Sequence, residues 1–135
     1  MNLEDVAGEL RTALGAITGL RRPPWGVEKI TPPAALIALP ERIDYDLAYG
    51  RGGDRIPDQS VIVLVANPTQ PAARRAIAKY ADGSGPKSVK AAIEAHTYTA
   101  CDTVRVEYAE FTPATYAGTE YLAAIFHLDI TGKGA

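Results

Sequence analysis

The sequence predicts a single α+β domain, with an N-terminal helix and two short helices packed chiefly on one face of a mixed or mostly antiparallel sheet. Three observations predict this class. Apolar side chains near the N-terminus follow a helical spacing, several later segments have the composition or alternation of strands, and a second helical stretch separates two groups of strands. With 135 residues, of which 47% are hydrophobic and 22% charged, the chain fits one domain over residues 1–135.

The first element is a helix predicted over residues 3–18. Asn2 can cap its first turn, where Glu4 and Asp5 suit the positive end of the helix dipole. Gly19 and the prolines that follow it end the helix. Its apolar side chains recur at steps of three and four and therefore form one stripe: Leu3, Val6, Leu10, Ala13, Leu14 and Ile17.

Four segments before residue 67 have the character of β-strands. Val27 to Ile30 is short, and the apolar run Ala34–Leu39 suits a strand covered on both faces. Arg42–Tyr49 alternates polar with apolar or aromatic side chains, which predicts a strand with one face in water. Ser60–Ala66 is β-branched and uncharged, so it is predicted to be the central strand.

Two helices and two strands are predicted to follow. Pro71 suits the first turn of a helix over Ala72–Ala81. Pro86 suits the start of a second, shorter helix. From Thr99 onward polar and apolar residues alternate again, which predicts two strands. The segment Phe111–Gly118 between them is expected to form a hairpin-like loop.

Composition argues against several classes of protein. The 14 Lys and Arg residues against 16 Asp and Glu residues, a net charge of -2, argue against a protein that coats nucleic acid or an anionic membrane. No apolar run has the roughly 18 residues that a membrane span needs, and the N-terminus lacks the pattern of a signal peptide. With only Cys101, His96 and His127, we expect no disulfide framework and no zinc site.

Two motifs resemble catalytic or binding signatures. The stretch Gly83–Ser88 is rich in glycine and leads into a helix, but Pro86 stands before Lys87 where a phosphate-binding loop requires glycine. A turn that caps the following helix is the favoured interpretation. Cys101 and His96 are close in sequence, but a nucleophilic pair also needs a third, orienting group. A small buried thiol is the commoner case for such a cysteine.

Other polar groups are interpreted as solvated side chains. His127 and Asp129 share a strand face, as do Asp44 and Asp46, and the second carboxylate pair is Glu107 with Glu110. The same interpretation applies to a basic helix face that has no aromatic residues for base stacking; it consists of Arg74, Arg75 and Lys79. We therefore expect a protein that is not an enzyme, without catalytic, cofactor-binding or metal-binding residues.

The segment from Asp44 to Gln59 is longer than a hairpin connection requires and carries Tyr and Arg side chains around three glycines. Such residues are favoured in interface cores, so the segment is predicted to be a contact surface; a disordered surface loop is the alternative. The only tryptophan lies in another loop, which is rich in proline. The candidate subunit-contact residues are Trp25, Tyr45, Tyr49, Arg51, Asp54 and Arg55.

Four stretches carry a resemblance to a known family: Ala38–Asp46, Tyr49–Arg55, Ala81–Lys90 and Ala123–Ile130. Together they resemble the tail terminator (tail completion) proteins of long-tailed phages that infect actinobacteria. The resemblance extends from the first helix to the last strand, and its motifs are not catalytic signatures.

Proteins of this family are small α+β subunits that form a ring, usually a hexamer, at the head-proximal end of the tail tube. The resemblance therefore implies a structural virion protein of the tail, made in the host cytoplasm, which stops tube polymerisation and provides the surface for head docking. It implies three kinds of protein partner: copies of itself, the tail tube protein and a head-completion or neck protein. Genome DNA would pass through the lumen of the ring without sequence-specific contact, and no membrane is involved.

A closed ring needs two different patches on each subunit. Tyr45–Pro57 is the candidate for one patch and Arg21–Trp25 for part of another, with Arg51 or Arg55 paired to a neighbour's carboxylate. Two alternatives stay open. One is another neck or head-completion ring protein, and the other is a small-molecule-binding domain or enzyme, which would require a convergent polar pocket.

Overall fold

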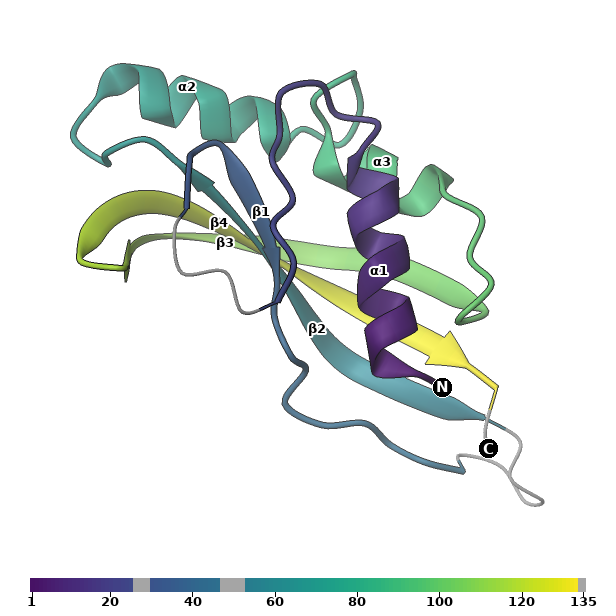
Figure 1. Ribbon diagram of the computed structural model, residues 1–135. Coiled ribbons are helices and arrows are strands. Elements are labelled where there is room, and N and C mark those ends of the chain that lie inside the picture. Colours follow the sequence, from purple (N-terminus) through teal and green to yellow (C-terminus); the bar gives the residue numbers. More distant parts are fainter. Residues whose placement is uncertain (26–29, 47–52, 134–135) are drawn as a thin grey trace.

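The computed structural model describes residues 1–25, 30–46 and 53–133. It confirms the α+β class: a four-stranded antiparallel sheet in the order β1-β2-β4-β3 carries three helices on one face (Figure 1). In chain order the elements are α1 (Leu3–Leu14), β1 (Ala34–Ile37), β2 (Asp54–Val65), α2 (Pro71–Tyr80), α3 (Val89–Ala95), β3 (Thr103–Tyr116) and β4 (Thr119–Gly132).

Helix α1 begins as predicted and ends earlier than predicted. The Asn2 side chain accepts a hydrogen bond from the Asp5 amide at 3.1 Å, which caps the first turn. The helix ends at Leu14, four residues before the predicted end, because Gly15 interrupts it and a turn follows. Ile17 is nevertheless buried, so the apolar stripe continues into the core from a turn.

Strand β2 is one of the two inner strands of the sheet and contains most of the predicted central strand Ser60–Ala66, but it starts at Asp54. The last six residues of the supposed long excursion, Asp54–Gln59, are therefore part of the sheet. The prediction of a strand over Arg42–Tyr49 is wrong for the described residues 42–46, which form only one bridge, between Asp44 and Arg55. Its alternating pattern belongs to a connection with one backbone bridge to the sheet, in which Ile43 packs against the core while Arg42, Tyr45 and Asp46 are exposed.

The β3–β4 hairpin is longer than predicted. The predicted loop Phe111–Gly118 is wrong, because β3 continues to Tyr116 and the turn consists of Ala117 and Gly118 alone. Both turn residues have positive φ, 51° and 78°, as two-residue hairpin turns require. Pro113 fits within β3 because this is an edge strand, where a missing amide hydrogen breaks no ladder.

The structure confirms the other two predicted helices, with small shifts in their first residues. α2 begins at Pro71. α3 begins after Ser88, not at Pro86, because the Ser88 hydroxyl caps it by accepting from the Ala91 amide at 3.1 Å. Lys87 donates to the carbonyl oxygen of Thr18 at 2.8 Å. The glycine-rich stretch before α3 therefore acts as a capping turn.

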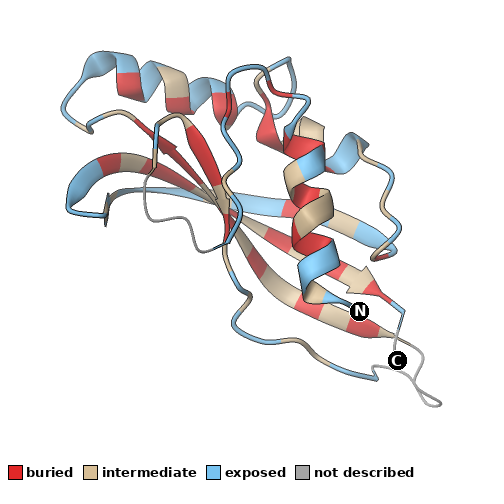
Figure 2. Cartoon of the chain, viewed as in Figure 1, coloured by how far each residue is buried: buried red, intermediate tan, exposed pale blue. Residues whose placement is uncertain are grey.

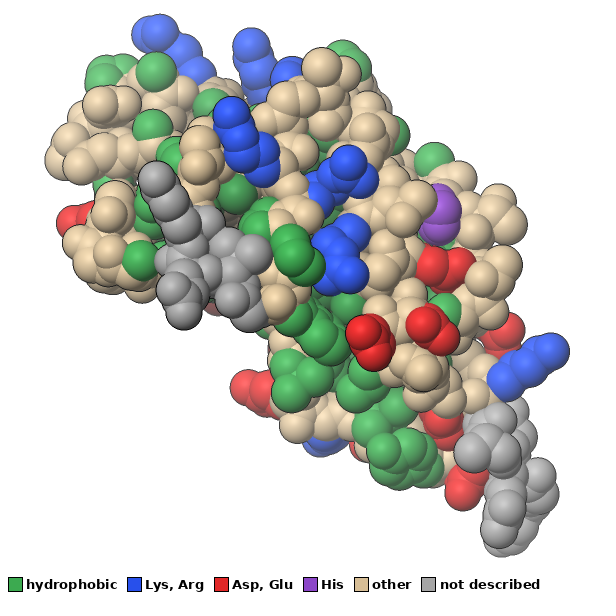
Figure 3. All heavy atoms as spheres, in the orientation of Figure 1, with side chains coloured by type: hydrophobic (Ala, Val, Ile, Leu, Met, Phe, Trp, Pro, Cys, Tyr) green, Lys and Arg blue, Asp and Glu red, His purple; other side chains and the backbone are tan. Residues whose placement is uncertain are grey.

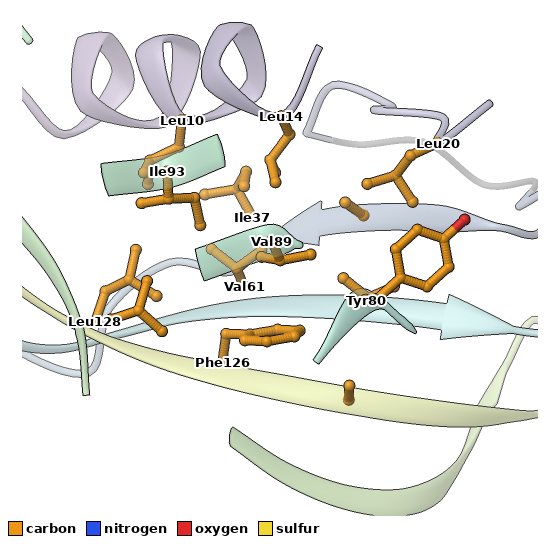
Figure 4. Packing of buried hydrophobic residues seen from close by; sticks show 14 of the residues in the cluster. Leu10, Leu14, Leu20, Ile37, Val61, Tyr80, Val89, Ile93, Phe126 and Leu128 are labelled. Carbon is orange, nitrogen blue, oxygen red and sulfur yellow. The ribbon is translucent and has the colours of Figure 1, made fainter. Parts of the chain in front are cut away.

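The core lies between the helices and one face of the sheet. Alternate residues of β2 and β4 point into it, so buried and less buried positions alternate along these strands (Figure 2). Side chains from α1 and α3 meet those of the sheet in one cluster (Figure 4). Its members include Leu10, Leu14, Val61, Ile93, Phe126 and Leu128.

Candidate functional site

The face of the sheet opposite the helices carries a polar cluster where β2, β4 and β3 lie side by side. In the strand register, His127 of β4 stands between Ser60 of β2 and Tyr108 of β3. His127 alternates with core residues on its strand, so its side chain points to this open face. Asp58 and Glu110 bring carboxylates to the same place.

His127 is held on three sides and is only 13% exposed. Its Nδ1 atom lies 2.7 Å from an oxygen of Asp58, in hydrogen-bonding geometry. Its Nε2 atom lies 2.8 Å from an oxygen of Glu110, but out of line, so this nitrogen has no hydrogen-bond partner among the described residues. The ring of Tyr108 stacks on the imidazole, with 4.3 Å between the ring centroids. The tyrosine therefore covers one face of the histidine.

The same cluster affects the acidity of Tyr108. Its partial desolvation raises the pKa of the phenol, and the nearby carboxylates of Asp58, Glu110 and Glu107 raise it further. Tyr108 therefore stays neutral at physiological pH and presents a polar ring, more than half exposed, to the outside. A neutral, exposed tyrosine is a residue suited to contacts with another protein.

A second polar pair lies next to the cluster on the open face. The Arg55 guanidinium donates to both oxygens of Asp129, at 2.9 and 3.0 Å. These hydrogen bonds and the charge of Asp129 raise the pKa of Arg55. The bidentate contact joins β2 to β4 within one chain. The sequence suggested that Arg55 pairs with a carboxylate of a neighbouring subunit, but here its guanidinium is already paired within its own chain.

The six predicted contact residues do not share one environment in the structure. Trp25 and Tyr45 are exposed, and the Trp25 indole N–H donates to the carbonyl of Ile37 at 2.7 Å. Tyr49 and Arg51 lie outside the described residues. Arg55 is on the open face, paired as above.

Asp54 is not a surface residue of this chain, since it is 2% exposed. Its carboxylate lies 3.0 Å from the terminal ammonium group of Met1 and also accepts a hydrogen bond from the Asp46 amide. Burial of a carboxylate requires such partners. Within this chain Asp54 therefore has a structural role at the start of β2, which differs from the surface position that the sequence suggested.

Both edges of the sheet are partly covered by other segments of the chain. The edge of β1 is covered, because the backbone of Arg21 bonds to Pro33 and Ala35 at 3.0 and 2.8 Å. This places part of the predicted Arg21–Trp25 contact loop against the sheet. The edge of β3 is covered at Val106, whose amide donates to a carboxylate oxygen of Glu94 at 3.0 Å. Beyond it, Phe111 is exposed.

The other sequence candidates do not converge. His96 packs edge-on against Tyr98 with 4.7 Å between centroids, whereas Cys101 is buried in the core. Burial raises the pKa of the Cys101 thiol to about 11, so it is mainly protonated at neutral pH. Asp44 lies near Arg42, and Asp46 is exposed.

Asp58 is the cluster residue that sequence reasoning missed. It contacts His127 across 69 positions of the chain, and a bulge between Ile56 and Gln59 sets its place on β2. Nothing in the local pattern around Asp58 marks this pairing, because it depends on β2 and β4 being neighbours.

In the part of the chain that the structure describes, no three His, Cys, Asp or Glu side chains are arranged to hold a metal ion. Nor does any described helix combine the length and apolar character needed to cross a membrane. No model of a known protein family matches the sequence, and no curated protein matches it.

Proposed function

We propose that this protein is a structural, non-enzymatic subunit of a phage tail that assembles as a ring, caps the head-proximal end of the tail tube and offers a surface for head docking. Two things support the proposal: the resemblance of four sequence stretches to tail terminator proteins, and the surfaces that the fold leaves without a partner in the described chain.

The observation that carries the proposal is the outer edge of β3. This strand has 14 residues and lies at the edge of the sheet. Tyr108 and Phe111 are large side chains on it that stay more than half exposed. An edge strand presents backbone groups that can pair with another chain, and exposed aromatic residues favour burial in a contact. This edge suits a subunit that works by covering another protein's edge.

Capping follows physically from such a contact. A subunit that pairs with the last ring of the tube buries the surface to which the next tube subunit would bind, so polymerisation stops. Apolar burial at Phe111 would stabilise the contact, and the polar cluster around Tyr108 would orient it. The opposite side of the ring would then be available to the neck of the head.

Electron microscopy of phage particles made with and without the gene tests the proposal. Loss of the protein should yield headless tails of abnormal length beside filled heads. Tails of normal length that fail to join heads would instead indicate a neck component. Normal, infectious particles would contradict both.

A single substitution tests the role of the β3 edge without removing the rest of the protein. Phe111→Glu should leave the chain folded, because the side chain is exposed, but should reproduce the tail-length defect of the deletion. Thr115→Glu is the matched control, because Thr115 is exposed on the same side of the same strand. Normal tails from Phe111→Glu would remove this edge from the proposed contact.

A further inference from the structure

A groove with basic side chains runs along helix α2, and the segment 39–46, which follows β1, is acidic. The groove is defined by two adjoining cavities, of about 250 and 300 Å³. Both are lined by Ala72, Ala76 and Tyr80. Pro32 and Pro33 form one wall. The floor is therefore apolar and of a size for one or two side chains of a binding segment.

The opposite wall of this groove is basic. Arg75, Lys79 and Lys87 line it. Arg21 adds a fourth cation near the proline wall, where its side chain donates to the Pro32 carbonyl at 3.2 Å. Across the described ranges, no carboxylate lies within ion-pair distance of any of these four side chains. Figure 3 shows Lys and Arg side chains gathered over the part of the molecule that contains α2.

Tyr80 adds a polar group to the groove. Its ring is buried, and in Figure 4 its hydroxyl lies at the end of the ring away from Phe126, on the side of Leu20. Within the described chain this hydroxyl makes no recorded hydrogen bond, although a tyrosine at such a boundary normally finds a partner. The groove thus combines an apolar floor, a hydroxyl and several cations.

The segment 39–46 has the opposite character. Leu39 and Tyr45 are 69% and 67% exposed, an unusual exposure for large apolar side chains. Glu41, Asp44 and Asp46 give the segment three negative charges against the one positive charge of Arg42. It is an acidic segment with two apolar anchors.

This segment is held in place before any contact forms. The Asp44 backbone exchanges two hydrogen bonds with Arg55, at 2.7 and 2.8 Å, and the Asp46 amide donates to Asp54. An ordered segment loses less conformational entropy when it binds, which favours affinity. In Figure 1 it runs along the bottom of the view, at the end of the molecule away from α2, so it does not fill the groove of its own chain.

We propose that residues 39–46 of one copy dock in the α2 groove of the next copy, head to tail, with Leu39 or Tyr45 on the apolar floor and the carboxylates facing the cations. The inference rests on the proposed function, because it names the contact between neighbouring subunits of the ring. Two different patches per subunit are what a heterologous, closed assembly requires. Charge complementarity sets the register of such a contact.

A charge exchange between two variants tests the contact. The groove variant carries Arg75→Glu and Lys79→Glu, and the segment variant carries Glu41→Lys and Asp44→Lys. In sedimentation velocity over a concentration series, the wild-type chain should self-associate, and each variant alone should have its dissociation constant raised about tenfold or more. A mixture should associate again, since the altered groove faces the altered segment and the two wild-type surfaces face each other.

The control variant is Arg74→Glu, which reverses an exposed charge on the same helix but does not line the groove. It should associate like the wild type, and circular dichroism should show that all variants are folded. Four outcomes would overturn the proposal: a wild-type chain that stays monomeric at its highest soluble concentration, variants that associate normally, a mixture that does not recover, and equal loss from Arg74→Glu.

This result is separable from the proposed function. If the mixture recovers but particles without the protein have normal tails, the contact stands and the phage role fails. If deletion gives tails of abnormal length but the mixture does not recover, the role stands and this assignment of the contact fails.

Discussion

The ring of Tyr108 lies almost parallel to the imidazole of His127, at 13° between their planes, and the two residues belong to neighbouring strands. Beneath the tyrosine, the histidine contacts Asp58 from the other neighbouring strand. Three strands are thus joined on the open face by side chains and not only by backbone hydrogen bonds. An aromatic pair of this kind adds to the packing of a sheet face that no helix covers.

Replacement of His127 by alanine should destabilise the fold by about 1 kcal/mol, because it removes a hydrogen bond to Asp58 and the surface on which Tyr108 stacks. Urea denaturation measures the change. Tyr108→Phe is the control, since it keeps the stack and removes a hydroxyl with no recorded partner in the described chain. A His127→Ala chain as stable as the wild type would show that the cluster contributes nothing to stability.

Cys101 should react slowly with a thiol reagent such as DTNB at pH 8 in the folded protein. It is 4% exposed, and its pKa is raised to about 11, so access and thiolate population are both low. Denaturant should increase the rate strongly, because the unfolded thiol is accessible and more acidic. Rapid modification of the native protein would contradict its placement in the core.

Glu9 should make stability depend on pH in the acidic range. Burial acts to raise the pKa of its carboxyl, but hydrogen bonds from Thr99 and Ala100 outweigh this and lower the pKa below the ordinary value of 4.5. Because the folded-state pKa is depressed, the stabilisation is present above pH 4.5 and is lost as the pH falls through the folded value.

The measurement is the difference in unfolding free energy between the wild type and Glu9→Gln. It should favour the wild type by about 1 kcal/mol near neutral pH, an amount reduced by solvent exposure, and shrink as the pH falls below 4.5. Glu120→Gln is the control, because Glu120 is exposed at the end of the hairpin and should show no such trend. A difference independent of pH would exclude the ionised Glu9 as its source.

Substitutions at the two residues of the turn between β3 and β4 should change the stability of the protein in opposite directions. Ala117 adopts φ of 51°, which is unfavourable for alanine, so Ala117→Asn should stabilise the protein by about 0.5–1 kcal/mol. Gly118→Ala should destabilise it by about 1 kcal/mol, because Gly118 has φ of 78°. Thermal unfolding checks both. Opposite signs would mean that the hairpin turn has another conformation.

Helix positions and the central strand could be predicted from local patterns. The stripe from Val6 to Leu14 and the β-branched run before Ala66 each identify their own element, because periodicity reports which side of an element faces the core. The predicted loop at Phe111 failed for a related reason. Threonine and aromatic residues also suit an edge strand, and only the pairing with β4 decides between the two.

The candidate site depended almost wholly on tertiary structure. Arg55 was identified as a surface cation, but its partner Asp129 lies 74 residues away and on a strand whose position could not be deduced locally. Asp54 was assigned to a contact surface for the same reason, since its burial depends on the N-terminus lying beside the start of β2.

The amino-acid sequence alone determined the class of fold, the positions of the three helices and of the β-branched strand before Ala66, and the apolar stripe of the first helix, because these follow from the spacing of apolar side chains along the chain. Only the tertiary structure decided which strands are neighbours and therefore which polar side chains meet. Hydrophobic burial is specified by short-range periodicity, whereas a contact such as that of His127 with Asp58 exists only after the sheet order brings distant segments together.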